Sequence, residues 1–421
     1  MKNTDVPVHA RLVRVLLPGV ICVLFTECAE SSRESVPAHN AAEPVDTSVV
    51  STPAISDTIE LQLRPLQRIG SSSDPDAESL GVIGAAVATT TGALFVCDRA
   101  DVQVRRYGAD GRLLSAVGRK GAGPSEYLSC DAMGVLPGDT VVVNDPSNGR
   151  MVLFGPSGAY VRSVQVRASG YLGAGTLGVD ERNGDVLMLS GRAGALAAGD
   201  YEHLQFTVWS SSGSSKGELS VPTRRANPLG RAFALSTADG DRLSVPPDTV
   251  WSLGREADLF VAAPDAYVIE RRSAQGRLRR YTRAATPVEY LAEERAEWEA
   301  IREANARRNA YELAAIPKQK PFIRELFVDA QRRLWVGVYA VAEQRVFSRP
   351  NATPTRPRVT YRERNRYDLF DVDRGTYIGT VVLPPNARPI AFERGKVWLV
   401  EEDASGAEQL AAYAVLPPGA P

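Results

Sequence analysis

A unit of the same length occurs twice in the chain, and this repeat constrains the fold more than any other feature. GALFVCDRADVQVRRYGADGRLLSAV begins at Gly92, and GDTVVVNDPSNGRMVLFGPSGAYVRSV begins at Gly138. With Leu94 set against Val141, the two segments align without a gap at an offset of 47 residues. Each predicts three short strands separated by a polar turn and a glycine-containing hairpin turn. A period of this length is typical of the blades of a β-propeller.

Weaker copies of the unit follow, beginning near Gly184, Asp258, Arg332 and Gly395. The segment ELQLRPLQRIG, which begins at Glu60, has the pattern of an outer strand with no strands before it to complete a blade. If this strand pairs with the last unit, it closes a ring and removes the exposed sheet edges. The sequence therefore predicts an all-β fold, a six-bladed β-propeller over residues 58–417.

The glycine-rich segment GRKGAGPSEY, Gly118 to Tyr127, lies between the last strand of one unit and the first strand of the next. We expect it to carry the chain across a blade, and no helix follows it to offer an N-terminus to a phosphate. Together with the preceding LFVCD and VRRYGADG motifs, it resembles the NHL-type, TolB-like six-bladed propellers, above all exported bacterial members of poorly defined function. The resemblance is clearest from Gly92 to Val166 and implies the fold without a particular activity.

The N-terminus has the form of an export signal over residues 1–28, with basic residues before the apolar run VLLPGVICVLF. Cys28 is a candidate for lipidation, but Glu27 departs from the usual lipoprotein pattern, so this stays open. Residues 29–57 are rich in Ala, Ser, Pro and Glu and predict a disordered tether. We therefore expect a periplasmic, outer-membrane-anchored or secreted protein.

Two insertions interrupt the predicted blades. Residues 286–313 predict a helix with Thr286 as its cap, Pro287 in the first turn, Glu289 in a capping box, and one apolar stripe. The stripe residues are Leu291, Trp298 and Ile301. A helix that covers the rim is favoured over a lid or a docking helix. Residues 340–366 form an Arg-rich loop, for which a solvated loop is favoured over a positive flap that captures anions.

By the usual strand order of a blade, both insertions and the turns after Cys97 and Asn144 leave the propeller on one face, where loops from all blades converge. The candidate binding residues there are Asp98, Arg99, Asp101, Asp145, Asn148, Arg356, Arg358, Arg362 and Arg364. For Asp98 and Asp145 a structural role is favoured, because an aspartate that ends a strand often caps the following turn.

Cys97 and Cys130 are the cysteines that remain outside the leader. They fall on neighbouring blades near one rim, so a disulfide is one interpretation and two buried free thiols are the other.

Residues suited to catalysis are scarce. The histidines are His9, His39 and His203, and a single histidine outside the leader and tether cannot supply a His-rich zinc site. No nucleophile-elbow motif accompanies it. Acidic residues at the channel mouth could bind Ca²⁺ as in lactonase-type propellers, although that ligand pattern is not recognisable. The acidic candidates are Asp98, Asp145, Glu401 and Glu402. No cofactor is predicted, with Ca²⁺ as the alternative.

The charge balance, 49 basic against 50 acidic residues, provides no field that would attract nucleic acid. We therefore expect a monomeric, non-enzymatic binding or scaffold propeller outside the cytoplasm, which touches a membrane only through a lipid anchor. The expected partner is a protein, peptide or anionic glycan. The alternatives are a metal-dependent hydrolase or lactonase-like enzyme, and a structural envelope component.

Overall fold

The computed structural model describes residues 48–52, 58–70, 79–166, 177–193, 201–224, 233–236, 242–245, 249–262, 264–273, 277–309, 315–344, 359–403 and 405–419. They all belong to one compact unit, Glu43–Pro421. The predicted export signal, Cys28, Arg356 and Arg358 lie outside these residues.

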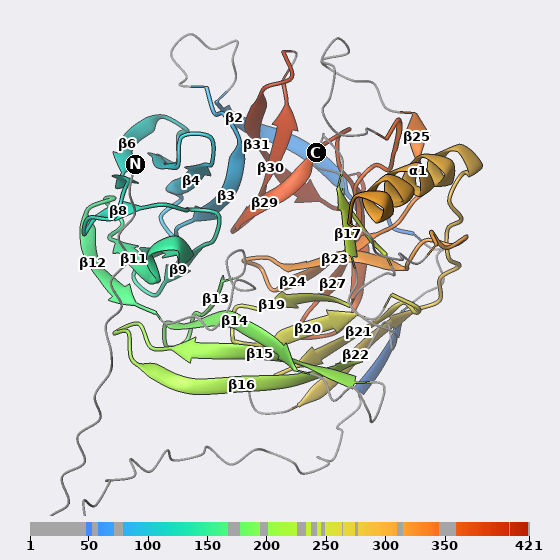
Figure 1. Cartoon of the computed structure of the whole chain (residues 1–421), viewed down its shortest axis with the longest axis horizontal. Coiled ribbons are helices and arrows are strands. Elements are labelled where there is room, and N and C mark those ends of the chain that lie inside the picture. Colours follow the sequence, from blue (N-terminus) through green and yellow to red (C-terminus); the bar gives the residue numbers. More distant parts are fainter. Residues whose placement is uncertain are drawn as a thin grey trace, which may run out of the picture. The chain divides into compact units, whose positions relative to one another are not determined.

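Six sheets, each built around four antiparallel strands, form the six blades of a β-propeller (Figure 1). In blades one to five these four strands follow the order of the chain, whereas blade six takes its outer strand from the segment before blade one. Blade one contains β3 (Ile83–Ala88), β4 (Leu94–Asp98), β5 (Gln103–Tyr107) and β6 (Leu113–Val117). Blade two contains β9 (Met133–Leu136), β10 (Thr140–Asp145), β11 (Arg150–Phe154) and β12 (Tyr160–Gln165). Blade three contains β13 (Leu177–Asp180), β14 (Asp185–Ala193), β15 (Tyr201–Trp209) and β16 (Ser215–Arg224).

Blade four contains β19 (Val250–Leu253), β20 (Leu259–Ala262), β21 (Val268–Arg272) and β22 (Leu278–Arg283). Blade five contains β23 (Ile323–Val328), β24 (Arg333–Val338), β27 (Arg366–Asp371) and β28 (Tyr377–Val382). Blade six contains β29 (Arg388–Glu393), β30 (Lys396–Glu402), β31 (Glu408–Leu416) and, as its outer strand, β2 (Gln62–Ile69). The predicted fold class and the predicted number of blades are confirmed.

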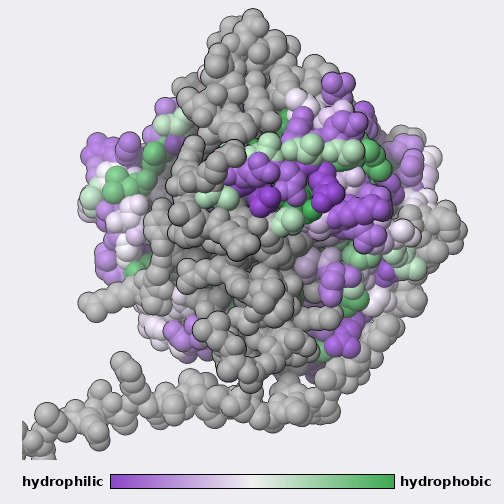
Figure 2. All heavy atoms as spheres, turned by 45° about the vertical axis from the view of Figure 1, so that its right-hand side comes forward, coloured by the Kyte–Doolittle hydropathy of each residue, from purple (hydrophilic) through white to green (hydrophobic). Residues whose placement is uncertain are grey.

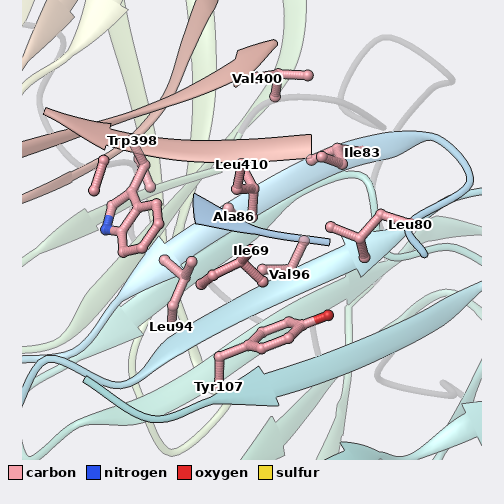
Figure 3. Close-up of a cluster of buried hydrophobic side chains, with 12 residues drawn as sticks. Ile69, Leu80, Ile83, Ala86, Leu94, Val96, Tyr107, Trp398, Val400 and Leu410 are labelled. Atoms are coloured by element: carbon pink, nitrogen blue, oxygen red, sulfur yellow. The ribbon is translucent and has the colours of Figure 1, made fainter. Parts of the chain in front are cut away.

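The hydrophobic core is divided among the six interfaces between successive blades. The positions of the side chains of β4 explain why residues 94–97 are all apolar. Leu94 and Val96 pack toward blade six, whereas Phe95 and Cys97 pack toward blade two. A strand buried on both faces cannot alternate between apolar and polar residues. Figure 3 shows the interface between blades six and one, where Trp398 and Leu410 meet the blade-one strands.

The N-terminal part of the described chain closes the ring. Strand β2 pairs antiparallel with β31, with Gln62 opposite Leu416, as the sequence predicts. Before it, Glu60 bridges in parallel to Thr380 at the edge of blade five.

Strand β1 (Ser48–Thr52) pairs in parallel with β22, at the outer edge of blade four. The prediction of a structureless tether over 29–57 is therefore wrong for these five residues. The segment SVVST is rich in β-branched residues and meets an open sheet edge, which favours a strand.

The glycine-rich segment after β6 is a structural corner. Strand β7 (Arg119–Lys120) pairs in parallel with β8 (Glu126–Tyr127), and the fully buried Tyr127 hydroxyl donates to the Val117 carbonyl and accepts from the Val104 amide. Gly118 has φ +64°, and a Cβ there would lie 2.6 Å from the Ser125 carbonyl oxygen. The glycine is required by both its backbone conformation and its surroundings.

Helix α1 (Ala292–Asn309) lies in the segment between blades four and five. Trp298 and Ile301 are buried against the hairpin of β17 (Phe233–Ser236) and β18 (Arg242–Val245), in a cluster that includes Leu235 and Leu243. The described packing of α1 is therefore on other segments that lie between blades, and it does not decide between a rim cover, a lid and a docking helix. Among the described residues, no helix combines the length and the apolar character needed to cross a bilayer.

The predicted start of this helix is wrong. The Lys320 amide donates to the Val288 carbonyl and the Tyr290 amide donates to the Lys318 carbonyl, which holds residues 288–290 extended. The cap is formed later, where the Glu294 carboxylate accepts the Leu291 amide at 3.2 Å. Thr286, Pro287 and Glu289 therefore precede the helix.

Candidate functional site

A cavity with several charged side chains in its lining lies beneath α1, where blades five and six turn toward the insertions. We call it the α1 cavity, and its volume is about 420 Å³. This volume is within the usual range for a small-ligand site. Its lining is contributed by the β17–β18 hairpin, α1, and the ends of strands in blades five and six. The lining residues are Leu243, Tyr290, Glu294, Trp298, Arg324, Glu325, Tyr339, Val359, Tyr361, Arg362, Glu363, Asn365 and Arg388.

Lys320 holds the elements around this cavity together. Its side chain is completely buried, and its ammonium lies 2.8 Å from Glu294 of α1 and 2.5 Å from Glu363. The same group donates to the Ala340 carbonyl at 3.0 Å and lies over the Tyr290 ring at 5.0 Å. A buried cation needs such compensation. The lysine therefore links the helix, the end of blade five and the loop before the helix.

The cavity carboxylates are each matched by a cation. Glu294 and Glu363 share Lys320, and Glu325 pairs with Arg324 at 3.1 Å while accepting a hydrogen bond from Tyr367. Burial raises the pKa of the Glu294 carboxyl, and the hydrogen-bonded Lys320 opposes this rise.

Tyr290 presents a polar atom without a partner to the cavity. The residue is 8% exposed, and its hydroxyl is buried with no hydrogen-bond partner in the structure. Burial raises the pKa of this phenol well above its usual value, as it does for Tyr339. The Tyr290 hydroxyl is therefore neutral at pH 7 and can donate or accept. Since buried polar groups are almost always paired, this atom calls for a ligand or a water.

A second cavity of about 390 Å³ lies on the other side of Tyr339, and we call it the Val341 cavity. It is bordered mainly by apolar groups from the connection between blades four and five and from the end of β24. At its polar end, Arg283 pairs with Asp368 at 2.6 Å and lies over the Tyr377 ring. Its lining residues are Tyr267, Arg283, Ala285, Thr286, Pro287, Val288, Pro321, Phe322, Val338, Tyr339, Ala340, Val341, Arg366 and Asp368.

In the space-filling view turned toward the side of α1, the described residues are mainly hydrophilic, with hydrophobic residues scattered between them (Figure 2). Val341 is one exposed hydrophobic residue at the second cavity, with 59% of its surface accessible.

Of the arginines predicted to bind anions, Arg362 and Arg364 are described. Arg362 lines the α1 cavity and donates to Asn386 at 3.3 Å, whereas Arg364 forms an exposed ion pair with Glu343 at 3.0 Å. Arg362 belongs to β26 (Tyr361–Arg362), which pairs with β25 (Glu343–Gln344). The two arginines therefore differ in position: one faces the cavity, and the other is held at the surface.

The predicted aspartates on blades one and two contact backbone amides and side chains near their own blade ends. Asp98 is fully buried and accepts from the Gly81, Val82 and Ala100 amides, with Arg105 at 3.3 Å. Asp101 pairs with the same arginine at 3.3 Å. These contacts agree with the structural role favoured for Asp98.

The remaining candidates on these blades are also paired locally. Asp145 is fully buried and accepts from Asn148 at 2.6 Å and from the Leu128 amide at 3.1 Å. Arg99 pairs with Asp131 at 2.8 Å. None of these residues lines either cavity, so the structure brings together only part of the predicted set.

Cys97 and Cys130 form a disulfide between β4 and the segment entering blade two, with their Cα atoms 5.6 Å apart. Of the two interpretations left open by the sequence, the structure has the bonded form.

The central channel differs from both cavities. A cavity of about 290 Å³ is lined there by the inner strands of all six blades, and most of its lining residues have apolar side chains, among them Val135 and Phe392. Glu181 and Arg255 form an ion pair beside it. Glu401, one predicted acidic candidate, accepts a hydrogen bond from Tyr413 at 2.6 Å. Within the described ranges, no group of three or more His, Cys, Asp or Glu side chains is arranged to hold a metal ion.

Comparison with known proteins gives neither a matching family model nor a matching curated protein. Solved structures do match. An exported protein of Bacteroides fragilis is 11% identical with a TM-score of 0.46, over 88% of this chain and 99% of that one. A member of the DUF4221 family from Bacteroides vulgatus is 10% identical with a TM-score of 0.46, over 85% and 98%. A streptogramin B lyase is 11% identical with a TM-score of 0.39, over 85% and 98%.

The sheets themselves define the class of this chain, which is a six-bladed β-propeller protein. Its sequence did not indicate the cavity residues Tyr290, Arg324 and Arg388, nor the buried Lys320. Each lies outside the repeat or at a blade end, and none stands in a recognisable motif.

Proposed function

We propose that this chain is a non-enzymatic binding propeller that acts outside the cytoplasm and recognises an anionic group of a partner at the α1 cavity. The observation that carries the proposal is the cavity itself, which combines Arg362, Arg388 and the carboxylate-paired Arg324 with the unpartnered Tyr290 hydroxyl. An unpartnered polar atom in a cavity of this size favours a bound ligand.

The guanidinium groups come from three different segments, which suits recognition of one anion from several sides. Arg324 lies in β23, Arg362 lies in β26, and Arg388 is the first residue of β29. Arg388 donates to the Ile83 carbonyl at 2.7 Å and lies 3.7 Å from Glu408. A guanidinium carries five N–H donors, so Arg388 keeps donors beside these two contacts for a carboxylate, sulfate or phosphate.

The sequence between Gln344 and Val359 adds to the positive charge. It contains four arginines and no acidic residue. The residue before this stretch, Gln344, belongs to β25, and the residue after it, Val359, lines the α1 cavity. This composition supports an anionic partner.

Two features support a location outside the cytoplasm. The leader has a basic start and a short apolar run, and the structure contains the Cys97–Cys130 disulfide. Structural disulfides persist mainly in oxidising compartments.

The test measures retention on immobilised heparin and on poly-glutamate, with elution by salt. We expect Arg362→Gln combined with Arg388→Gln to weaken binding by about tenfold or more, because charge-assisted hydrogen bonds contribute about 1.5–3 kcal/mol each. The matched control is Arg374→Gln, an exposed arginine in the turn that joins β27 to β28 and paired with Asp371. Its retention should stay unchanged.

A second variant tests the arginines of the loop. Changing Arg356, Arg358, Arg362 and Arg364 to Ser should reduce retention further, and binding should also fall as salt rises. Equal retention of the wild-type protein, the cavity variant and the loop variant, all with unchanged melting temperatures, would overturn the proposal.

A further inference from the structure

The two cavities on the insertion face differ in chemistry although they share a wall. The α1 cavity is lined by charged and aromatic side chains, whereas the Val341 cavity is bordered by Ala285, Val288, Phe322, Val338 and Val341. Tyr339 lines both. A ligand that reaches across Tyr339 therefore meets a polar site and an apolar site in succession.

The wall between the cavities is firmly held. Tyr339 directly precedes Ala340, whose carbonyl accepts from the buried Lys320, and whose amide lies 3.4 Å from Glu363. The same lysine is bonded to Glu294 of α1. Both cavities are thus fixed by one network, and a preformed pair of sites costs less ordering energy on binding than a flexible one.

The apolar cavity distinguishes between the kinds of anionic ligand. A sulfated or carboxylated glycan carries hydroxyl groups on every ring, and burying them beside Val338, Val341 and Phe322 without partners would be unfavourable. A peptide offers aliphatic or aromatic side chains next to acidic ones. Burial of one such side chain contributes about 1.5–3 kcal/mol.

The Tyr290 hydroxyl is a third feature that bears on the ligand, after the two cavities. It is buried, it has no hydrogen-bond partner, and it lines the polar cavity. A peptide carboxylate or backbone group in that cavity would satisfy it, in the cavity that Arg362 and Arg388 also line.

From this arrangement we infer that the ligand is a peptide segment of a partner protein in which an acidic residue stands beside a large apolar residue. The acidic side chain occupies the α1 cavity, and the apolar side chain occupies the Val341 cavity. The inference rests on the proposed function and specifies its ligand. It predicts selectivity for a pair of side chains, which charge alone does not provide.

The experiment measures binding of the full chain to labelled, end-capped hexapeptides by fluorescence anisotropy. One set carries leucine or phenylalanine beside glutamate, and the reference carries alanine beside glutamate. We expect the apolar–acidic peptides to bind about tenfold more tightly than the reference, which corresponds to about 1.4 kcal/mol. Equal binding of the two sets would overturn the inference.

Two variants locate the contacts. Val341→Gln should remove most of the advantage of the leucine peptide, whereas Val161→Gln should not, since Val161 is similarly exposed at 53% but lies on blade two. Tyr290→Phe should weaken the glutamate peptides about fivefold without lowering the melting temperature, because it removes a buried hydroxyl that has no partner. If Tyr290→Phe and Val341→Gln both bind like the wild-type protein, the inference fails.

These outcomes separate the inference from the proposed function. If Arg362→Gln with Arg388→Gln abolishes retention on poly-glutamate but leucine and alanine peptides bind equally, the anion site stands and the paired-cavity inference is wrong. If heparin alone is retained and no acidic peptide binds, the ligand is a glycan, and the inference is likewise wrong. If that double variant changes nothing, the proposed function itself fails.

Discussion

The side chain of Lys320 is completely buried, and its ammonium group contacts three separate segments of the chain. Lysines are rarely buried, and the sequence PKQKPF has no feature that marks this one. The sequence could not predict the contact because its partners, Glu294 and Glu363, lie on an insertion and at a blade end.

We predict that Lys320→Met destabilises the protein by about 3–5 kcal/mol, because it leaves two carboxylates buried without their cation. The control is Lys318→Met, whose side chain is 75% exposed in an ion pair with Glu289 and which should change stability by less than about 0.5 kcal/mol. Urea unfolding at pH 7 measures both. A loss for Lys320→Met no larger than for Lys318→Met would contradict the assigned role.

The loss of stability caused by Lys320→Met should depend on pH. Burial raises the folded-state pKa of Glu294 above its usual value of 4.5, so protonation of this carboxyl favours the folded state, and that stabilisation is lost as pH rises through the raised pKa. Removing Lys320 removes a group that lowers this pKa, so the rise becomes larger. The stability gap between wild type and Lys320→Met should therefore shrink as pH falls from 7 toward 4.5. A gap that is constant over this window would show that Glu294 is not the group left unpaired.

Among the elements, the strands of blades one and two were predicted best, because both faces of β4 and β10 are buried and the repeat aligns them directly. Helix α1 was predicted, but its first turn was not. The capping pattern beginning at Thr286 is correct as local chemistry, yet pairing of residues 288–290 with 318–320 overrides it. Tertiary contacts of this kind are absent from a local pattern.

The disulfide joins neighbouring blades and closes a loop with a sequence separation of 33. We predict that Cys130→Ala lowers stability by about 3–4 kcal/mol under oxidising conditions, mainly because the unfolded chain gains freedom. Thermal melting with and without a reductant measures it. The reductant should lower the wild-type melting temperature and leave that of Cys130→Ala unchanged. An identical melting temperature for both proteins without reductant would contradict the prediction.

At the scale of the whole molecule, the sequence predicted the number of blades and the closing strand β2. It did not predict that residues before β2 pair with the edges of other blades. Residues 48–52 pair with the outer edge of blade four and Glu60 bridges to the outer edge of blade five, before β2 enters blade six. Their composition resembles a linker, and only the presence of open sheet edges converts part of it into a strand. The α1 cavity was missed for a related reason, since it forms where an insertion meets the ends of two blades.

Two truncations separate these contributions. Removal of residues 1–57 should leave a folded propeller with a melting temperature lowered by only a few degrees, because β2 still closes the ring. Removal of residues 1–70 should cause aggregation or a much larger loss, because it exposes the edge of β31 and removes the buried Ile69. Circular dichroism and size-exclusion chromatography measure both. Equal behaviour of the two truncated proteins would show that closure does not depend on β2.

The pairing of Gln62 with Leu416 also fixes when the protein can finish folding. A ribosome makes β2 before the strands of blade one and makes its partner β31 after the other described strands of the propeller, so β2 waits for β31. Until then, blade one lacks its neighbour, because the cluster around Trp398 and Leu410 is not yet present. Contacts between distant parts of a chain form slowly. The ring of the nascent chain therefore stays open, with the blade-six face of blade one uncovered, until β31 has been made.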